Sequence, residues 1–157
     1  MPWTPPTITT DRLSLAAPTD NDQVRFSPDL NPGSESELPG LPSNWAIRLK
    51  QTDKAIGSIG YMRWNRRTCV AELGFILDAT HRNQGLMTEA CEAVIAFGFE
   101  SMHLETVETR SFPHNLPSLR VFEKVGMKPF DQLKARISMK GEWVDLLVYR
   151  IEKTAVS

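Results

Sequence analysis

A short polar segment followed by an apolar helical pattern is the part of this chain best suited to bind an anion. The segment Arg82–Met87 contains Gly85 and overlaps the start of a helix that we expect from about Gln84 to Glu100. The first turn of a helix presents unpaired backbone N–H groups, and the helix dipole adds about half a positive charge there. Arg82 would be a further cationic donor. The local chemistry therefore indicates a place for phosphate groups, although many ordinary strand–loop–helix connections also contain one glycine.

Two elements must position this segment. Cys69–Leu77 is an apolar run that predicts a strand, and the polar residues Asp78–Asn83 predict a loop directly after it. The helix that follows has one apolar face, which indicates that it packs on the sheet. The residues of this face recur at the 3.6-residue period of a helix and are Leu86, Ala90, Val94 and Phe97.

Two blocks of sequence resemble one known family. RNQGLM at residues 82–87 resembles the Q/R-x-x-G-x-G/A pyrophosphate loop of the GNAT N-acyltransferases, and its flanks AELGFIL and TEA resemble the branch of the ribosomal-protein acetyltransferases RimJ and RimL. NLPSLRVFEKVGM, Asn115–Met127, resembles the N-x-x-S-x-x-x-x-E-K-x-G-F segment of that branch. Two blocks in this order and separation are far more specific than either alone. The resemblance extends from about Thr10 to Lys153, with a poor match between about Ala17 and Ser43.

The resemblance implies how acetyl-CoA would be bound. Its pyrophosphate would lie on the backbone N–H groups of Arg82–Thr88, with Gly85 removing a Cβ where the backbone must come close. Its pantetheine arm would pair with the central strand like an added strand. Met87 departs from the generic motif, which has Gly or Ala there, but the RimJ-like branch tolerates Met. The cofactor-binding residues that the resemblance implies are Phe75, Ile76, Leu77, Arg82, Asn83, Gln84, Gly85, Leu86, Met87, Thr88, Asn115, Ser118 and Phe122.

A carboxylate in the central strand is the first candidate for the base that deprotonates the amine. Glu72 occupies a position where several GNAT enzymes carry a glutamate, and it shares a strand face with Ile76. A carboxylate of raised pKa is able to accept a proton from an ammonium, directly or through water. A structural carboxylate bonded to a neighbouring strand fits the same pattern, so both roles stay open. Glu108 is the second candidate, with a structural role favoured, and His81 and His114 are interpreted as surface histidines.

The acid that protonates the departing thiolate differs from a common GNAT pattern. Many members carry a tyrosine where this chain has Phe122, and phenylalanine cannot donate a proton. The RimL-like branch offers a serine instead, which Ser118 matches, while Asn115 would hold a pantetheine amide or a water. Asn115 is also a good N-cap for a helix at Leu116–Val125, in whose first turn a serine often bonds backbone. We predict catalytic roles for Glu72, Ser118 and Asn115.

The composition is that of a soluble globular protein. The 157 residues are 41% apolar and 24% charged with a net charge of −1, which gives no basic patch for nucleic acid. The longest apolar run, near Ala93–Phe99, is too short to span a membrane, and no signal peptide is expected. Cys69 and Cys91 are interpreted as free thiols, which fits a reducing cytoplasm, and no metal-site spacing occurs. A monomer or a homodimer fits equally.

Around these motifs the sequence predicts a single domain over residues 1–157, with an α/β GNAT fold whose mixed central sheet is flanked by helices. Met1–Thr9 is rich in proline and is expected to be loose. Residues 17–43 hold five prolines, so we expect a turn or short helix near Asp20–Phe26 and then a loop, a shortened version of the region where family members place two helices. Further strands are expected at Thr10–Ala16, Trp45–Lys50, Ala55–Trp64, His103–Arg110, Met127–Ile137 and Glu142–Glu152.

The preferred function is transfer of the acetyl group of acetyl-CoA to a primary amine by direct attack. The acceptor would be a protein N-terminus or a small-molecule amine, and no metal is implied. One alternative is a non-catalytic acyl-CoA-binding or regulatory module of the same fold, since the usual tyrosine is missing. A more remote alternative is a purely structural α/β domain, which would have no affinity for CoA.

Overall fold

A computed structural model describes residues 5–17, 45–139 and 141–153 of the chain. The turn or short helix expected at Asp20–Phe26, and nearly all of the proline-rich region 17–43, lie outside the described residues. The shortened helical region therefore stays a prediction.

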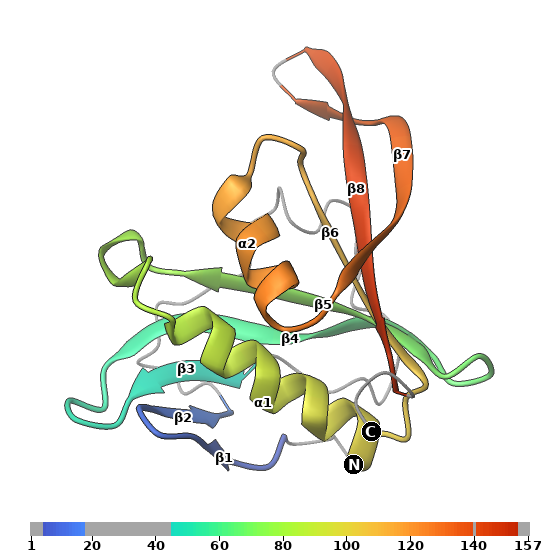
Figure 1. The fold of residues 1–157 in the computed structure, drawn as a ribbon. Helices are drawn as coiled ribbons and strands as arrows, with labels where there is room; N and C mark the ends of the chain where they lie inside the picture. Colours follow the sequence, from blue (N-terminus) through green and yellow to red (C-terminus); the bar gives the residue numbers. More distant parts are fainter. Residues whose placement is uncertain (1–4, 18–44, 140, 154–157) are drawn as a thin grey trace.

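The described strands form one mixed sheet of eight strands, in the order β1-β2-β3-β4-β5-β6-β8-β7 (Figure 1). All neighbouring pairs are antiparallel except β5 and β6, which are parallel. This arrangement confirms the mixed central sheet. The strands are β1 (Ile8–Thr9), β2 (Leu13–Ala16), β3 (Trp45–Leu49), β4 (Ala55–Asn65), β5 (Val70–Leu77), β6 (Thr106–Ser111), β7 (Lys128–Met139) and β8 (Glu142–Glu152).

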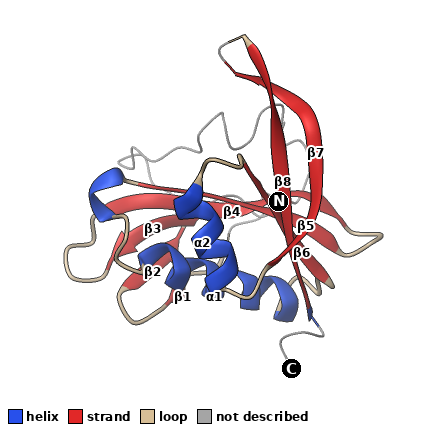
Figure 2. Cartoon of the chain, turned by 45° about the horizontal axis from the view of Figure 1, so that its top comes forward, coloured by secondary structure: helices blue, strands red, loops and turns tan. Residues whose placement is uncertain are grey.

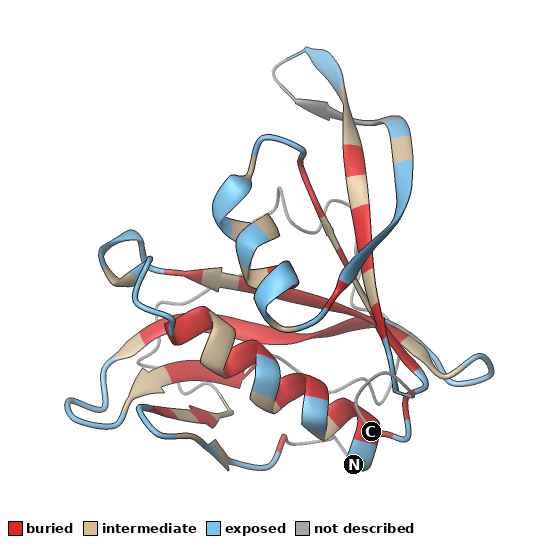
Figure 3. Ribbon diagram, viewed as in Figure 1, coloured by how far each residue is buried: buried red, intermediate tan, exposed pale blue. Residues whose placement is uncertain are grey.

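Two helices, α1 (Leu86–Glu100) and α2 (Leu116–Lys124), cover one face of the sheet (Figure 2). The inner side of α1 is a continuous buried stripe, whereas most of α2 is exposed (Figure 3). Alternate residues of β5 point into the same core as the buried side of α1, as a two-residue period requires. No helix among the described residues is long and apolar enough to cross a membrane. The core members from β5 are Ala71, Leu73, Phe75 and Leu77.

The parallel strands β5 and β6 separate before β5 ends. Their pairing runs from Val70↔Thr106 to Glu72↔Glu108, while β5 continues to Leu77. Just past the last pair, Thr109 Oγ1 donates a hydrogen bond of 2.8 Å to Leu73 O. Main-chain groups alternate in direction along a strand, so Phe75 and Leu77 aim theirs at the side that β6 has left. The sheet therefore opens between these two strands.

The N-terminal segment is more ordered than its prolines suggest. Ile8 and Thr9 pair with β2, and Pro6 O accepts a hydrogen bond of 2.8 Å from the indole of buried Trp45. The expectation of a loose segment does not hold for residues 5–9. The strand expected from Thr10 begins at Leu13, because residues 10–12 turn the chain, with Thr10 N donating to Leu13 O at 2.9 Å.

Left-handed residues explain two further differences from the expected boundaries. Helix α1 begins at Leu86 rather than Gln84, because Gly85 has φ +78° and cannot belong to an α-helix. Strand β6 begins at Thr106 rather than His103, because His103 has φ +58° and Leu104 N returns to Gly98 O at 3.0 Å. The turn residues thus decide where the regular elements start.

The middle of α1 is fixed to the sheet by buried groups. Tyr61 on β4 donates a hydrogen bond of 2.7 Å to Val94 O, inside the helix. Cys91 lies on the same buried side, and burial together with the nearby charge of Glu92 raises the pKa of its thiol. The helix that carries the anion-binding segment is therefore tightly packed at its centre.

Candidate active site

A cavity of about 450 Å³ lies where β6 leaves β5. One wall is the end of β5 and another is the loop that leads into α1. The opposite wall is formed by the end of β6 and by α2. The residues that line the cavity are Phe75, Ile76, Leu77, Arg82, Asn83, Gly85, Leu86, Met87, Thr88, Phe112, His114, Asn115, Pro117, Ser118, Arg120, Val121 and Lys124.

One end of the cavity is the N-terminus of α1. The first intrahelical bond joins Glu89 N to Gly85 O at 3.1 Å, so the N–H groups of residues 86–88 precede it. Gly85 supplies the left-handed backbone at this point. Met87, which replaces the usual small residue, packs its side chain among the buried core residues. The substitution therefore leaves the backbone of the first turn available to a ligand.

The charge of the cavity wall favours an anion. Arg82, Arg120 and Lys124 line it, and the described lining residues include no carboxylate. Arg82 is placed by a hydrogen bond of 3.2 Å from its Nε to Leu77 O. Sequence reasoning missed Arg120 and Lys124, although their spacing of four residues on the expected helix places both on one side.

Asn115 and Ser118 both lie at the start of α2 and both line the cavity. Asn115 caps the helix, with its Oδ1 accepting from Ser118 N at 3.5 Å. The N-cap prediction is confirmed. The cap joins the side chain of Asn115 to the backbone of Ser118, and both residues still line the cavity, so the capping role and a role toward a ligand are compatible.

A comparison with protein families decides the relationship. The model of an acetyltransferase (GNAT) domain matches residues 10–128, which is more than half of the chain. The chain belongs to the GNAT family of acetyltransferases. The family and the fold predicted from the two sequence blocks are thereby confirmed.

Individual relatives agree with this. The uncharacterized N-acetyltransferase p20 of Bacillus licheniformis is 26% identical over 151 residues, covering 96% of this chain and 83% of p20. A GNAT-family acetyltransferase from Bacillus anthracis has a TM-score of 0.73 at 22% identity, covering 94% of this chain and 99% of that one. RimJ of Mycobacterium smegmatis, solved in complex with CoA-disulfide, has a TM-score of 0.68 at 22% identity, covering 72% of this chain and 54% of RimJ. The solved structures show a shared fold.

Two residues that the GNAT resemblance assigned to the cofactor do not line the cavity. Phe122 is buried and packs edge-on against Phe75, with ring centroids 5.9 Å apart, and against Tyr149 at 5.2 Å. It supports the wall from behind. The side chain of Gln84 turns away to donate to Thr80 O at 3.3 Å. The other residues that the resemblance assigned to the cofactor all line the cavity.

The candidate base Glu72 lies outside the cavity lining. Its carboxylate is buried, with Oε1 at 3.1 Å from Arg110 Nε and 3.8 Å from Arg63 Nη1. Burial raises the pKa of Glu72, while the charges of Arg110 and Arg63 oppose that rise and the charge of Glu108 adds to it. Glu108 itself is ion-paired with Arg150. The carboxylates of Glu72 on β5 and Glu108 on β6 therefore belong to one charged cluster, together with Arg63, Arg110 and Arg150.

Of the two histidines that the sequence placed in loops near the site, His114 lines the cavity and His81 does not. His114 is exposed, as the surface interpretation predicted. It also lines the cavity and stacks on Phe112, with ring centroids 5.6 Å apart and planes at 8°. Its position directly before the capping Asn115 was the available signal. His81 interacts with Asp78 and Thr80 in the preceding loop. No group of three or more His, Cys, Asp or Glu able to hold a metal occurs among the described residues.

Proposed function

We propose that this protein transfers the acetyl group of acetyl-CoA to a primary amine. The observation that carries the proposal is the cavity itself. Its cationic end at the start of α1 suits the phosphates of CoA. Its other wall offers the main chain of Phe75 and the N–H of Leu77 to the amides of the pantetheine arm, since Leu77 O already accepts from Arg82 Nε. Its lining contains no carboxylate among the described residues, so nothing there repels a phosphate.

The proposed reaction is a direct transfer. The amine nitrogen forms a bond to the acetyl carbon and the carbon–sulfur bond breaks, so that an amide and a CoA thiolate result. Two protons leave the nitrogen, one from the ammonium before attack and one after the carbon–nitrogen bond has formed. One proton is delivered to the thiolate to give the CoA thiol, and the other passes through the base to water. Preorganised backbone N–H groups at the open end of β5 would stabilise the oxyanion that forms on the way.

Residues of this chain divide these tasks. We assign Glu72 as the base, because burial raises the pKa of its carboxyl, and it would act through water since it does not line the cavity. His114 is the alternative, since it lies in the wall and histidine is the side chain that serves most often as a general base. Ser118 would donate to the sulfur, and Asn115 would hold a pantetheine amide. The acceptor is a protein N-terminus or a small amine.

Excess acetyl-CoA is expected to raise the melting temperature of the protein. A ligand that binds only the folded state at a hundredfold excess over Kd adds about 2.7 kcal/mol to the free energy of unfolding. Free CoA should act similarly and ATP should not, because ATP lacks the pantetheine arm. Differential scanning fluorimetry measures all three, and no shift with acetyl-CoA at millimolar concentration would contradict the proposal.

Turnover separates an enzyme from a binding module. Peptides with a free N-terminus, polyamines and amino acids would be screened for release of the CoA thiol. Acetylation of any of these supports the proposal. A clear thermal shift with no release across the panel would instead favour a non-catalytic acyl-CoA-binding module.

A further inference from the structure

We propose that Arg12 is a positioning residue for the acetyl-CoA site. Together with Glu89 it holds the segment 82–88 from outside the cavity, in the conformation that receives the diphosphate. This inference rests on the proposed function, since it concerns the same cofactor. The contacts come from the turn between β1 and β2, more than seventy residues earlier in the chain.

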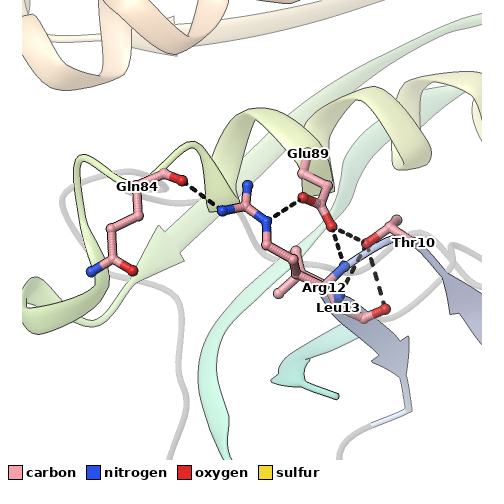
Figure 4. Close-up of polar contacts among 5 residues, drawn as sticks. All are labelled: Thr10, Arg12, Leu13, Gln84 and Glu89. Carbon is pink, nitrogen blue, oxygen red and sulfur yellow. Dashed lines mark hydrogen bonds and ion pairs between the residues drawn. The ribbon is translucent and has the colours of Figure 1, made fainter. Parts of the chain in front are cut away.

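The guanidinium of Arg12 lies between the loop and the helix (Figure 4). Its Nη1 donates to Gln84 O at 2.9 Å, and its Nε donates to Glu89 Oε1 at 2.8 Å. The other carboxylate oxygen of Glu89 accepts from Arg12 N at 2.8 Å and from Thr10 Oγ1. One side chain thus connects the last residues of the loop to the first turn of α1.

The hydrogen bond from Arg12 to Gln84 O sets the direction of the Gly85 N–H group. The C=O of Gln84 and the N–H of Gly85 belong to one planar trans peptide, so they point in opposite directions. Holding the carbonyl toward Arg12 therefore turns Gly85 N–H away from Arg12. Arg12 does not line the cavity, whereas Gly85 does. Loss of the bond would let this peptide rotate and scatter the N–H groups that converge on the anion.

Gly85 and Glu89 are both in close contact with the Arg12 side chain. A Cβ placed on Gly85 would lie 3.3 Å from Arg12 Nη2, so the guanidinium occupies the space beside the glycine. Partial burial acts to raise the pKa of Glu89, but hydrogen bonds from Thr10 and Arg12 outweigh it and lower the pKa overall. Glu89 therefore stays ionised, and its pairing with Arg12 adds no net charge to the site. The Arg12–Glu89 pair therefore acts by holding the backbone in place rather than by adding an electrostatic attraction for the phosphates.

The test compares CoA with pantetheine, which lacks the diphosphate. Arg12→Ala and Glu89→Gln are each expected to weaken CoA binding about tenfold, because charge-assisted bonds are lost. The double variant should lose little more than the worse single variant, since both residues form one unit. Pantetheine affinity, followed by chemical-shift titration, should change less than twofold. Arg67→Ala removes a positive charge from an exposed turn and serves as the charge-matched control.

Hydrogen exchange gives a second readout without any ligand. Amides of residues 84–88 should exchange about tenfold faster in Arg12→Ala, while those at the centre of α1 keep their rates. Unchanged CoA affinity and unchanged exchange, or an equal loss for CoA and pantetheine, would overturn the inference. If Arg12→Ala does not fold, Arg12→Lys replaces it, because lysine cannot bridge Gln84 and Glu89 in the same way. Wild-type protein that fails to bind CoA would instead refute the proposed function.

Discussion

Gly57→Ala is expected to lower the free energy of unfolding by about 3 kcal/mol and to weaken acetyl-CoA binding at the same time. A Cβ on Gly57 would lie 2.4 Å from Ile76 O and 3.2 Å from Leu77 Cα. Both are backbone atoms of the neighbouring strand, so no side-chain rotation relieves the contact. Strands β4 and β5 must move apart at this point.

The effect on binding follows from where the contact falls. Gly57 pairs with Leu77, at the end of β5 that forms one wall of the cavity. A shift of this segment moves the main-chain groups that we assign to the pantetheine arm. Denaturant unfolding and calorimetric titration with CoA measure the two effects.

Gly141→Ala provides the matched control. Gly141 has φ +83°, but no heavy atom lies within 4 Å of the place of its Cβ. Left-handed strain alone should cost about 1 kcal/mol and leave CoA affinity unchanged, since the β7–β8 turn is not part of the cavity lining. Equal losses for the two variants would contradict the role of close packing at Gly57.

Glu72→Gln is expected to reduce kcat by about a hundredfold or more, the usual cost of losing a general base. Its affinity for CoA should stay within twofold, because Glu72 does not line the cavity. Glutamine keeps the size of the side chain but cannot accept the proton, and it also removes the negative charge that faces Arg110 and Arg63. The rate is measured by thiol release with the best acceptor from the amine panel.

The two carboxylates of the charged cluster can be told apart in the same assay. Glu108 lies beside Glu72 in the parallel register and is paired with Arg150. We expect Glu108→Gln to lower stability rather than kcat. A rate for Glu72→Gln within twofold of the wild type would move the assignment to His114, for which His114→Gln is the corresponding variant.

The raised pKa of Glu72 also determines how the variant responds to pH. Burial is the main cause of that rise, and the folded state therefore favours the protonated carboxyl. A carboxyl whose pKa is higher in the folded state than in the unfolded state contributes its full stabilisation at pH values below the unfolded-state pKa. This contribution is lost as the pH rises through the folded-state pKa. Glutamine has no such loss. The stability of Glu72→Gln relative to the wild type should therefore increase with pH across this interval.

Local patterns were sufficient for the elements that carry the site. The apolar run before the loop, Gly85, and the Asn115 cap of α2 were all read from neighbouring residues, because each depends on interactions within a few positions. These parts of the site are specified by short-range periodicity and capping. The burial of Met87 in the core was not predicted, since the sequence showed this residue only as a departure from the loop motif.

Interactions between distant segments were not accessible in this way. The link from Arg12 to Glu89 depends on how the start of β2 packs against α1. The burial of Phe122 depends on contacts with Phe75 of β5 and Tyr149 of β8. The opening between β5 and β6 is also a tertiary feature, since nothing in either strand marks where pairing stops. The start of β6 was displaced for a different, local reason, since the left-handed residue His103 ends the turn after α1.

The burial of Cys91 makes the thiol a built-in reporter of motion. The group is inaccessible and its pKa is raised, so a thiol reagent reacts with it only when α1 leaves the sheet. The labelling rate then measures the free energy of that opening. Because α1 also carries the first turn at the cavity, saturating CoA should slow the labelling in proportion to its affinity. Partly exposed Cys69 would react first and can be replaced by serine to leave a single slow signal.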